Sequence, residues 1–149
     1  MVFVWTAFFA AALVIATVLI HYEVLRGTSR LVATVPAAAR TRILLVLAGI
    51  FIAHILEVCL YAVAYMLMSD HLGLGSVHGA SAGAFVDFFY FSITCYTTLG
   101  LGDIFPSGAM RIIAGIEALN GFVLIGWSTS FTYLAMERFW REAKKPHAS

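Results

Sequence analysis

Long apolar runs separated by short polar stretches dominate the chain. Three of these runs, residues 2–20, 43–68 and 112–136, have about the 20 helical residues needed to cross a hydrocarbon core. A backbone exposed to lipid must satisfy its own hydrogen bonds, so each run is predicted to be a transmembrane helix. A secretory signal peptide is the alternative interpretation of the first run, but no Lys or Arg precedes Arg26 to form its basic region.

A fourth apolar run, residues 85–96, is too short to span a membrane. About a dozen apolar residues is the length of a re-entrant or buried half-helix. The segment that follows, residues 98–103, reads Thr-Leu-Gly-Leu-Gly-Asp. Irregular backbone at membrane depth is tolerated only where protein buries it or where it lines a water-filled path. The pattern therefore predicts a permeation pathway or an ion site.

Composition agrees with a membrane protein and excludes other classes. Of 149 residues, 62% are hydrophobic and 11% are charged. The formal charge of +1 gives no strongly basic face for nucleic acid. The sequence has no metalloprotease, nucleophile-elbow or phosphate-loop motif, so we expect neither an enzyme nor a small-molecule substrate. Cys59 and Cys95 lack the spacing of a zinc site or a disulfide framework.

The basic residues predict the orientation of the spans. Eight of the nine Lys and Arg lie in residues 26–42 and 138–145, and the ninth is Arg111. The positive-inside rule then places both basic segments in the cytoplasm. We expect a multi-pass protein of the cell membrane with its N-terminus outside and its C-terminus in the cytoplasm. The first basic segment can lie along anionic lipid or be a plain connector.

Residues 98–103 resemble the selectivity filter Thr-Val-Gly-Tyr-Gly-Asp of potassium channels. Residues 85–96 and the spans on either side resemble the helix, pore loop, helix unit of that family, over roughly residues 43–136. The resemblance implies a homotetramer in which backbone carbonyls, with the Thr98 hydroxyl, replace the water shell of K⁺. The implied ion-binding residues are Thr98, Leu99, Gly100, Leu101 and Gly102. Gly100 and Gly102 can take the positive φ that such a backbone needs.

The predicted fold is an all-α membrane protein assembled as a tetramer. Each chain has three transmembrane helices, with a re-entrant pore helix and a selectivity-filter loop between the second and third. Its parts are an N-terminal transmembrane helix (1–26), a cytoplasmic basic connector (27–42), a pore domain (43–136) and a short cytoplasmic tail (137–149).

The resemblance also assigns residues that support the filter. Asp103, at the outer mouth, is expected to hold the filter and attract cations. Tyr90 and Phe91 occupy the positions of the family's aromatic cuff. Two positions depart from the family pattern: Thr94 stands where small bacterial channels have a glutamate that pairs with the acid, and Cys95 replaces a Thr.

Leu101 is a third departure, because it replaces the aromatic residue of the filter. It keeps the carbonyl but loses the hydroxyl that ties the family's filter to the pore helix. Two-pore-domain potassium channels also contain a Gly-Leu-Gly filter, so selectivity for K⁺ remains compatible with Leu101.

Two glycines in the third span are candidate gating hinges. Gly121 lies ten residues after Arg111, which matches the spacing from basic residue to hinge glycine in the bacterial channels, and Gly126 is the second candidate. Close packing of helices is the alternative role of glycine in a membrane span.

Three ionisable residues lie inside the spans, where they are costly and therefore functional candidates: His54, Glu57 and Glu117. His54 and Glu57 can meet on one helix face. Counting residues from the predicted outer ends brings Glu57 and Glu117 into one polar network behind the filter, with Asn120 reaching the cavity or the back of the filter. The network senses pH or sets filter stability, or it merely pairs buried polar groups.

These observations predict a potassium-selective channel that conducts dehydrated K⁺. Two alternatives stay open. A nonselective cation channel results if Leu101 loosens the filter, and a non-conducting membrane or transporter subunit can be built from the same helix, pore loop, helix unit.

Overall fold

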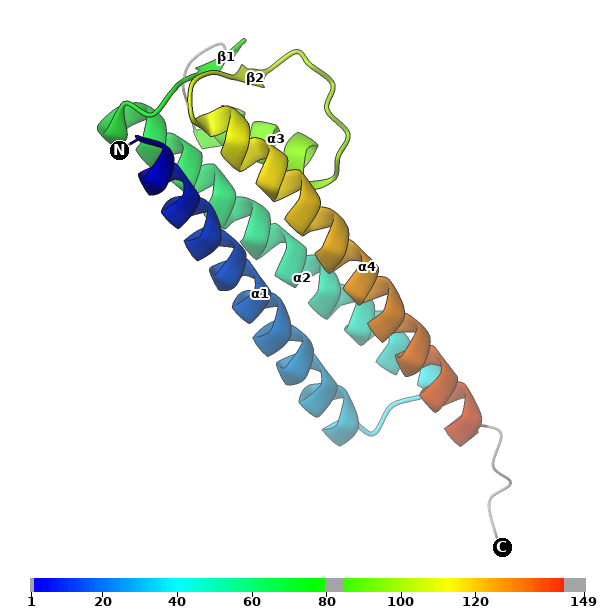
Figure 1. Cartoon of the computed structure of the whole chain (residues 1–149). Helices are drawn as coiled ribbons and strands as arrows, with labels where there is room; N and C mark the ends of the chain where they lie inside the picture. Colours follow the sequence, from blue (N-terminus) through cyan, green and yellow to red (C-terminus); the bar gives the residue numbers. More distant parts are fainter. Residues whose placement is uncertain (1, 80–84, 144–149) are drawn as a thin grey trace, which may run out of the picture.

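A computed structural model describes residues 2–79 and 85–143, and most of them are helical (Figure 1). Three long helices and one short one make up the described chain, with a single π-helical turn, η1, after the second. Two two-residue strands pair antiparallel, with Val77 opposite Pro106 and His78 opposite Phe105. The elements are α1 (Val2–Thr34), α2 (Ala39–Leu67), η1 (Met68–Leu72), β1 (Val77–His78), α3 (Phe85–Tyr96), β2 (Phe105–Pro106) and α4 (Met110–Ala143).

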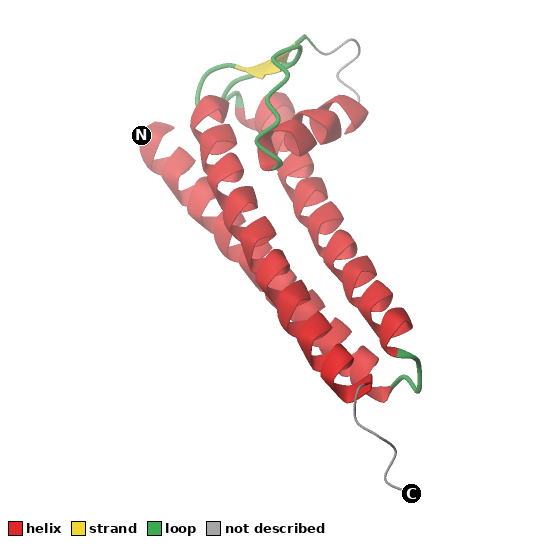
Figure 2. Cartoon of the chain, turned by 90° about the vertical axis from the view of Figure 1, so that its right-hand side faces the viewer, coloured by secondary structure: helices red, strands yellow, loops and turns green. Residues whose placement is uncertain are grey.

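The three long helices lie side by side, and α3 sits at one end of the bundle, as the two views show (Figures 1 and 2). α3 packs against α2 and α4, and α1 packs against these same two helices. Within the described ranges, α1, α2 with η1, and α4 are each long and apolar enough to cross a membrane. The three predicted spans are therefore helices of spanning length.

α1 extends well past the predicted end of the first span, because a helix can continue after it ceases to be apolar all round. Between residues 21 and 34, Leu25 and Val32 are buried while Arg26 and Arg30 are exposed. This amphipathic pattern keeps one face packed while the other meets a polar environment. Much of the predicted connector, residues 27–34, is thus helical, and only residues 35–38 link α1 to α2. Pro36 disfavours helical backbone at Val35 and so ends α1.

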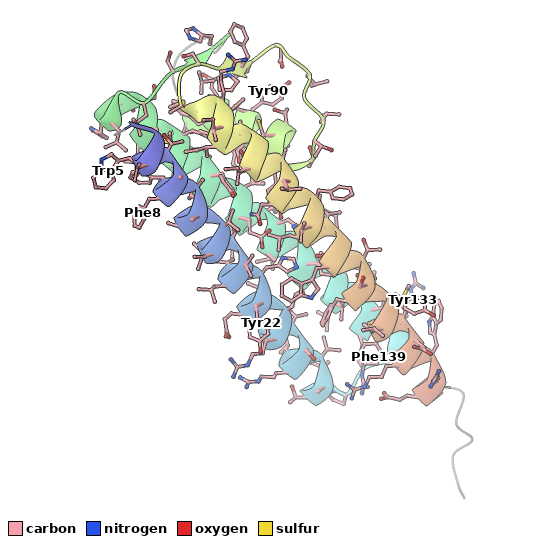
Figure 3. The ribbon with its side chains drawn as sticks, in the orientation of Figure 1. Trp5, Phe8, Tyr22, Tyr90, Tyr133 and Phe139 are labelled. Carbon is pink, nitrogen blue, oxygen red and sulfur yellow. The ribbon has the colours of Figure 1, made fainter. Side chains whose placement is uncertain are left out.

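Two apolar clusters hold the bundle together. The one near α3 is built around Tyr61, Tyr65 and Phe91, and the Tyr65 and Phe91 rings meet edge to face at 4.9 Å. The one at the opposite end includes Leu25 and Phe139. The outer surface is also strongly apolar: Trp5 and Phe8, for example, point away from the bundle (Figure 3). Such a surface fits lipid or neighbouring subunits.

Candidate functional site

The segment that contains Gly100 and Gly102 follows α3 and forms an exposed, irregular loop. Residues 97–103 are all exposed in the single chain. Thr98, Gly100 and Gly102 have φ of 58°, 53° and 82°, and Thr98 is the one non-glycine residue with positive φ among those described. Positive φ is costly for a β-branched residue, and such strain tends to gather at functional sites.

Backbone hydrogen bonds join this loop to the last turn of α3. The Thr98 N–H donates to the Cys95 carbonyl at 2.9 Å, and the Gly100 N–H donates to the Thr94 carbonyl at 3.1 Å. The Thr94 hydroxyl is buried and donates to the Phe91 carbonyl at 2.8 Å, so within this chain it bonds its own helix. Cys95 is half-buried beside it. These contacts fix where the loop begins.

A side chain of α3 anchors the far end of the loop. The Tyr90 hydroxyl donates to Asp103 Oδ2 at 2.8 Å, and this bond raises the pKa of Tyr90 above its ordinary value. Tyr90 therefore ties α3 to the end of the loop. Phe91 instead faces the core against Tyr65.

The two candidate hinge glycines of α4 have different surroundings. A Cβ on Gly121 would lie 2.2 Å from the Tyr96 carbonyl oxygen, so this glycine lets α4 touch the backbone of α3. A Cβ on Gly126 would have no neighbour within 4 Å. α4 runs without a break through both positions. Gly121 is therefore a close contact between α4 and α3, and Gly126 is not.

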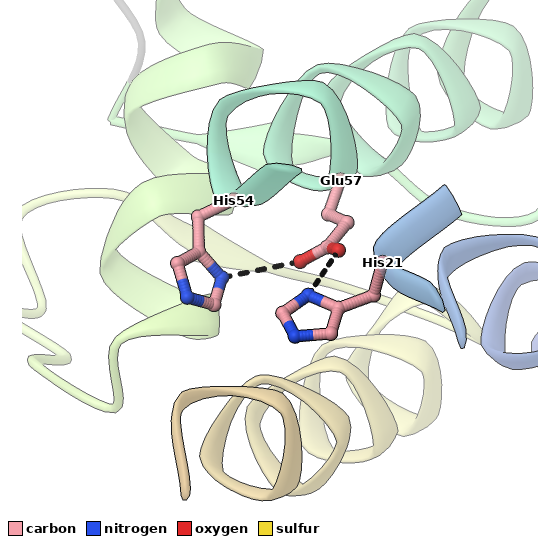
Figure 4. A group of neighbouring side chains, drawn as sticks. All are labelled: His21, His54 and Glu57. Atoms are coloured by element: carbon pink, nitrogen blue, oxygen red, sulfur yellow. Dashed lines mark hydrogen bonds and ion pairs between the residues drawn. The ribbon is translucent and has the colours of Figure 1, made fainter. Parts of the chain in front are cut away.

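Behind the loop, the fully buried Glu57 carboxylate lies between two histidines (Figure 4). Its Oε1 is 2.8 Å from His21 Nδ1, and its Oε2 is 3.2 Å from His54 Nδ1. The Tyr96 hydroxyl donates to Oε2 and lies 2.8 Å from His54 Nδ1. Ser128 Oγ contacts Nε2 of both rings, at 3.3 Å for His21 and 3.0 Å for His54. We call these five residues the histidine cluster; it joins α1, α2, α3 and α4.

Glu117 belongs to a separate buried group that contains no histidine. Tyr65 donates to its Oε2 at 2.5 Å, and Ser92 lies 2.6 Å from its Oε1. We call Tyr65, Ser92 and Glu117 the hydroxyl cluster. Asn120 lies between the two clusters, where its Nδ2 donates to Thr17 Oγ1 at 2.8 Å and to the Tyr61 hydroxyl at 3.3 Å.

The single network predicted for His54, Glu57, Glu117 and Asn120 is therefore divided. Only the His54–Glu57 contact forms as expected, and no hydrogen bond between described residues joins Glu57 to Glu117. Because α2 and α4 are antiparallel, Tyr65 lies opposite Glu117 while His54 lies opposite Ser128. Glu57 is eight residues from Tyr65, which is about 12 Å along a helix. Counting residues from the predicted outer end of the second span placed Glu57 too close to the outer surface. The predicted span ended at residue 68, whereas the helical backbone continues through η1 to Leu72.

His21 is the member of the histidine cluster that the sequence did not single out. It lies one residue beyond the apolar run of residues 2–20 and so was not counted among the ionisable residues of the three runs. A signal was present in the spacing: Leu13, Thr17, His21 and Leu25 recur every four residues, and all four are buried. Such a stripe indicates a helix face that packs against protein.

An apolar cavity of about 710 Å³ reaches the histidine cluster from the side of α2, α3 and α4. His54, Tyr96, Thr97 and Ser128 contribute to its wall, which is otherwise lined mainly by aliphatic and aromatic side chains of these helices. His54 keeps 19% of its side chain exposed, whereas His21 and Glu57 keep none. The cluster is thus buried but not sealed.

The matches to known proteins include the part of the chain that contains the exposed loop. A family described as an ion channel matches residues 43–138. The inward rectifier potassium channel Kirbac3.1 of Paramagnetospirillum magnetotacticum is 30% identical over 80 residues, which are 53% of this chain and 25% of that protein. The chain therefore matches about a quarter of the length of this relative. No solved structure matches the chain.

Proposed function

We propose that this chain, which belongs to the ion channel family, forms a potassium-selective channel in the membrane. The observation that carries the proposal is the alternation of φ in the exposed loop, positive at Thr98, Gly100 and Gly102 and not at Leu99 or Leu101. A backbone in which left-handed and right-handed conformations alternate turns successive peptide groups toward the same side of the chain. In the proposed filter the groups on one side are the carbonyls, which would face the ion.

The transported substrate is dehydrated K⁺. Carbonyls of Thr98, Leu99, Gly100 and Leu101 and the Thr98 hydroxyl replace its water shell, and Gly102 allows the chain to leave the filter. One chain supplies only one side of each ring of oxygens, so the channel is a homotetramer. The name of the Paramagnetospirillum relative, a potassium channel, supports K⁺ as the ion.

The orientation follows from charge. The N-terminus and the loop lie outside, and the bundle end with Arg26, Arg30 and Arg40 lies in the cytoplasm. Arg30 and Arg40 are exposed, and Arg26 is paired with Glu23 at 2.9 Å. Anionic lipid at the cytoplasmic surface is the partner that fits the exposed arginines.

The third span carries the gate. Gly126 is the better placed of the two hinge candidates, because nothing crowds it, whereas bending α4 at Gly121 would disturb its contact with Tyr96. Closure of α4 below Gly126 would narrow the pore without moving α3.

Potassium flux in liposomes tests the proposal. Purified protein is reconstituted with an outward K⁺ gradient, and flux is measured in K⁺, after replacement of K⁺ by Na⁺, and with Ba²⁺ as blocker. We expect Ba²⁺-sensitive flux in K⁺ and little in Na⁺. Equal flux in the two ions would favour the nonselective channel, for which Leu101 is the specific observation, and absence of flux from a verified tetramer would favour a non-conducting subunit.

A pair of glycine variants separates loss of the pore from loss of the fold. Gly100 and Gly73 have φ of 53° and 59°, and a Cβ added at either glycine would have no neighbour within 4 Å. Gly100→Ala and Gly73→Ala therefore introduce similar strain. We expect Gly100→Ala to abolish K⁺ flux while Gly73→Ala conducts; equal loss in both would count against the filter assignment.

A further inference from the structure

We infer that the histidine cluster is a binding site for a divalent transition-metal ion such as Zn²⁺, held by His21, His54 and Glu57 with the Tyr96 oxygen beside them. The inference concerns a site behind the loop and does not depend on whether the chain conducts K⁺.

The three candidate ligands converge from two helices, α1 and α2, and Tyr96 joins them from α3. One nitrogen each from His21 and His54 and one oxygen of Glu57 lie within 4.8 Å of one another. The closest separations between a histidine nitrogen and a Glu57 oxygen are 2.8 Å for His21 and 3.2 Å for His54 (Figure 4). The Tyr96 hydroxyl oxygen is 2.8 Å from His54 Nδ1. Bonds of about 2.1 Å to a tetrahedral Zn²⁺ put neighbouring ligand atoms about 3.4 Å apart. To admit the ion, the His21–Glu57 contact must lengthen by about 0.6 Å and the His54–Glu57 contact by about 0.2 Å.

In one pair of tautomers the hydrogen bonds leave a place for a cation at this point, whereas in the other pair both Nδ1–H groups donate to Glu57. Ser128 Oγ has two lone pairs and can accept Nε2–H from both His21 and His54. Each neutral ring then points the Nδ1 lone pair at Glu57, which is an acceptor when ionised. The Tyr96 hydroxyl brings one proton to this group. Three acceptors facing one another need further protons or a metal ion, and one divalent ion satisfies all three at once.

The chemistry of the donors selects the class of ion. Two imidazoles and one carboxylate suit Zn²⁺, Fe²⁺, Ni²⁺ or Cu²⁺, whereas Ca²⁺ and Mg²⁺ prefer sets of oxygen ligands. Ser128 then acts in the outer shell, where it orients both rings through their other nitrogens. The apolar cavity reaches His54 and Tyr96, so these two side chains are accessible from the side of α2, α3 and α4.

Metal at this site would fasten the N-terminal helix to the rest of the bundle. His21 is the contribution of α1, His54 and Glu57 come from α2, and Tyr96 is the last residue of α3. The loop begins at the next residue. A bound ion therefore couples the position of α1 to the base of the loop.

Metal binding to the purified full-length chain in detergent tests the inference. Zn²⁺ is added and binding is followed by titration calorimetry, by metal analysis after desalting, and by the thermal unfolding midpoint with and without EDTA. We expect one ion per chain and a midpoint that rises with Zn²⁺ and returns with EDTA, because a ligand that binds only the folded state stabilises it. A chain that takes up no stoichiometric Zn²⁺ would overturn the inference.

Histidine variants locate the ion. His21→Gln and His54→Gln should each lose the stoichiometric ion, while the control His71→Gln/His78→Gln, at two exposed positions, should keep it. Binding that survives in His21→Gln, or that disappears in the control, would also overturn the inference.

Two measurements keep the test decisive if a ligand variant does not fold. Ser128→Ala keeps every ligand and removes only the outer-shell contact, so Zn²⁺ affinity should fall by about tenfold or more. Co²⁺ bound to the wild-type chain should show the visible absorption of a nitrogen- and oxygen-ligated ion of low coordination number. Unchanged affinity in Ser128→Ala together with a Co²⁺ spectrum like that of the hydrated ion would show that binding occurs elsewhere.

Discussion

Glu57 and Glu117 are both fully buried carboxylates of facing helices, yet their surroundings differ in kind. Glu57 lies among two imidazoles and a phenol, next to a cavity. Glu117 meets only hydroxyl groups, from Tyr65 and Ser92. Imidazoles can exchange protons or bind a metal, whereas hydroxyls chiefly donate hydrogen bonds. Burial alone therefore does not tell a responsive carboxylate from a structural one; the partners do.

Counting protons shows why the hydroxyl cluster is structural. Ser92 has one hydroxyl proton and two acceptors within reach, the Val58 carbonyl at 3.0 Å and Glu117 at 2.6 Å. An amide in place of the carboxylate would donate to Ser92, which would donate to Val58, while Tyr65 would donate to the amide oxygen. Ser92, Tyr65 and the amide oxygen would then be paired, and one of the two amide hydrogens would lack an acceptor within this cluster. The site thus needs the shape of Glu117 more than its charge.

The largest expected difference between the two clusters is in the loss of stability when each glutamate is replaced by glutamine. Glu57→Gln removes the anion shared by two histidines, and breaking a buried ionic group typically costs about 3–5 kcal/mol. Glu117→Gln should cost about 1 kcal/mol or less, since its hydrogen bonds can be remade. Unfolding titrations with SDS in mixed micelles would compare the two variants. Equal losses would mean that the clusters do not differ as described.

The next largest loss of stability is expected when a side chain is added at the contact between α4 and Tyr96. Gly121→Ala puts a methyl group 2.2 Å from a backbone oxygen that cannot move away easily, and overpacking of this kind costs about 1–3 kcal/mol. Gly126→Ala is the matched control and should change stability by about 1 kcal/mol at most. The thermal midpoint in detergent measures both. A tolerated Gly121→Ala would show that α4 can shift relative to α3.

Removing one phenol from each cluster should have a smaller effect. Tyr96→Phe takes a donor from Glu57 and a neighbour from His54, and Tyr65→Phe takes a donor from Glu117. Each should cost about 1–2 kcal/mol of unfolding free energy. Only Tyr96→Phe should also change Zn²⁺ affinity. A change of Zn²⁺ affinity in Tyr65→Phe would break the distinction between the clusters.

The smallest effect on stability is expected at the exposed end of the loop. Tyr90→Phe removes the hydrogen bond to Asp103 while leaving both buried clusters intact. Because the pKa of Tyr90 is raised in the fold, the bond is present at neutral pH and is lost as pH rises through that raised value.

The ratio of K⁺ to Na⁺ flux measures the role of this bond. It should be lower in Tyr90→Phe than in wild type at neutral pH. In strongly alkaline solution the wild-type ratio should fall to that of the variant or below it, because the Tyr90 phenolate and Asp103 repel each other. A ratio that is the same at every pH would show that Tyr90 does not steady the loop.

The sequence was most informative where a local rule was sufficient. Spanning length and hydropathy predicted α2 and α4, and the two glycines of the loop take the positive φ expected of them. It was least informative about registry between helices. The split between the Glu57 and Glu117 groups depends on how far α2 slides along α4, and the continuation of α2 through η1 decides this.

By itself the sequence determined a membrane protein with three spanning helices and a glycine-containing loop after a short helix, because hydropathy and glycine conformation are local properties. Tertiary structure alone decided that His21 meets His54, that Ser128 bridges them, and that Gly121 is a contact with Tyr96. These residues lie far apart in the chain, and helix packing sets their separation to within an ångström. The metal-binding inference rests entirely on such distances, since no spacing along the chain relates His21 to His54 and Glu57.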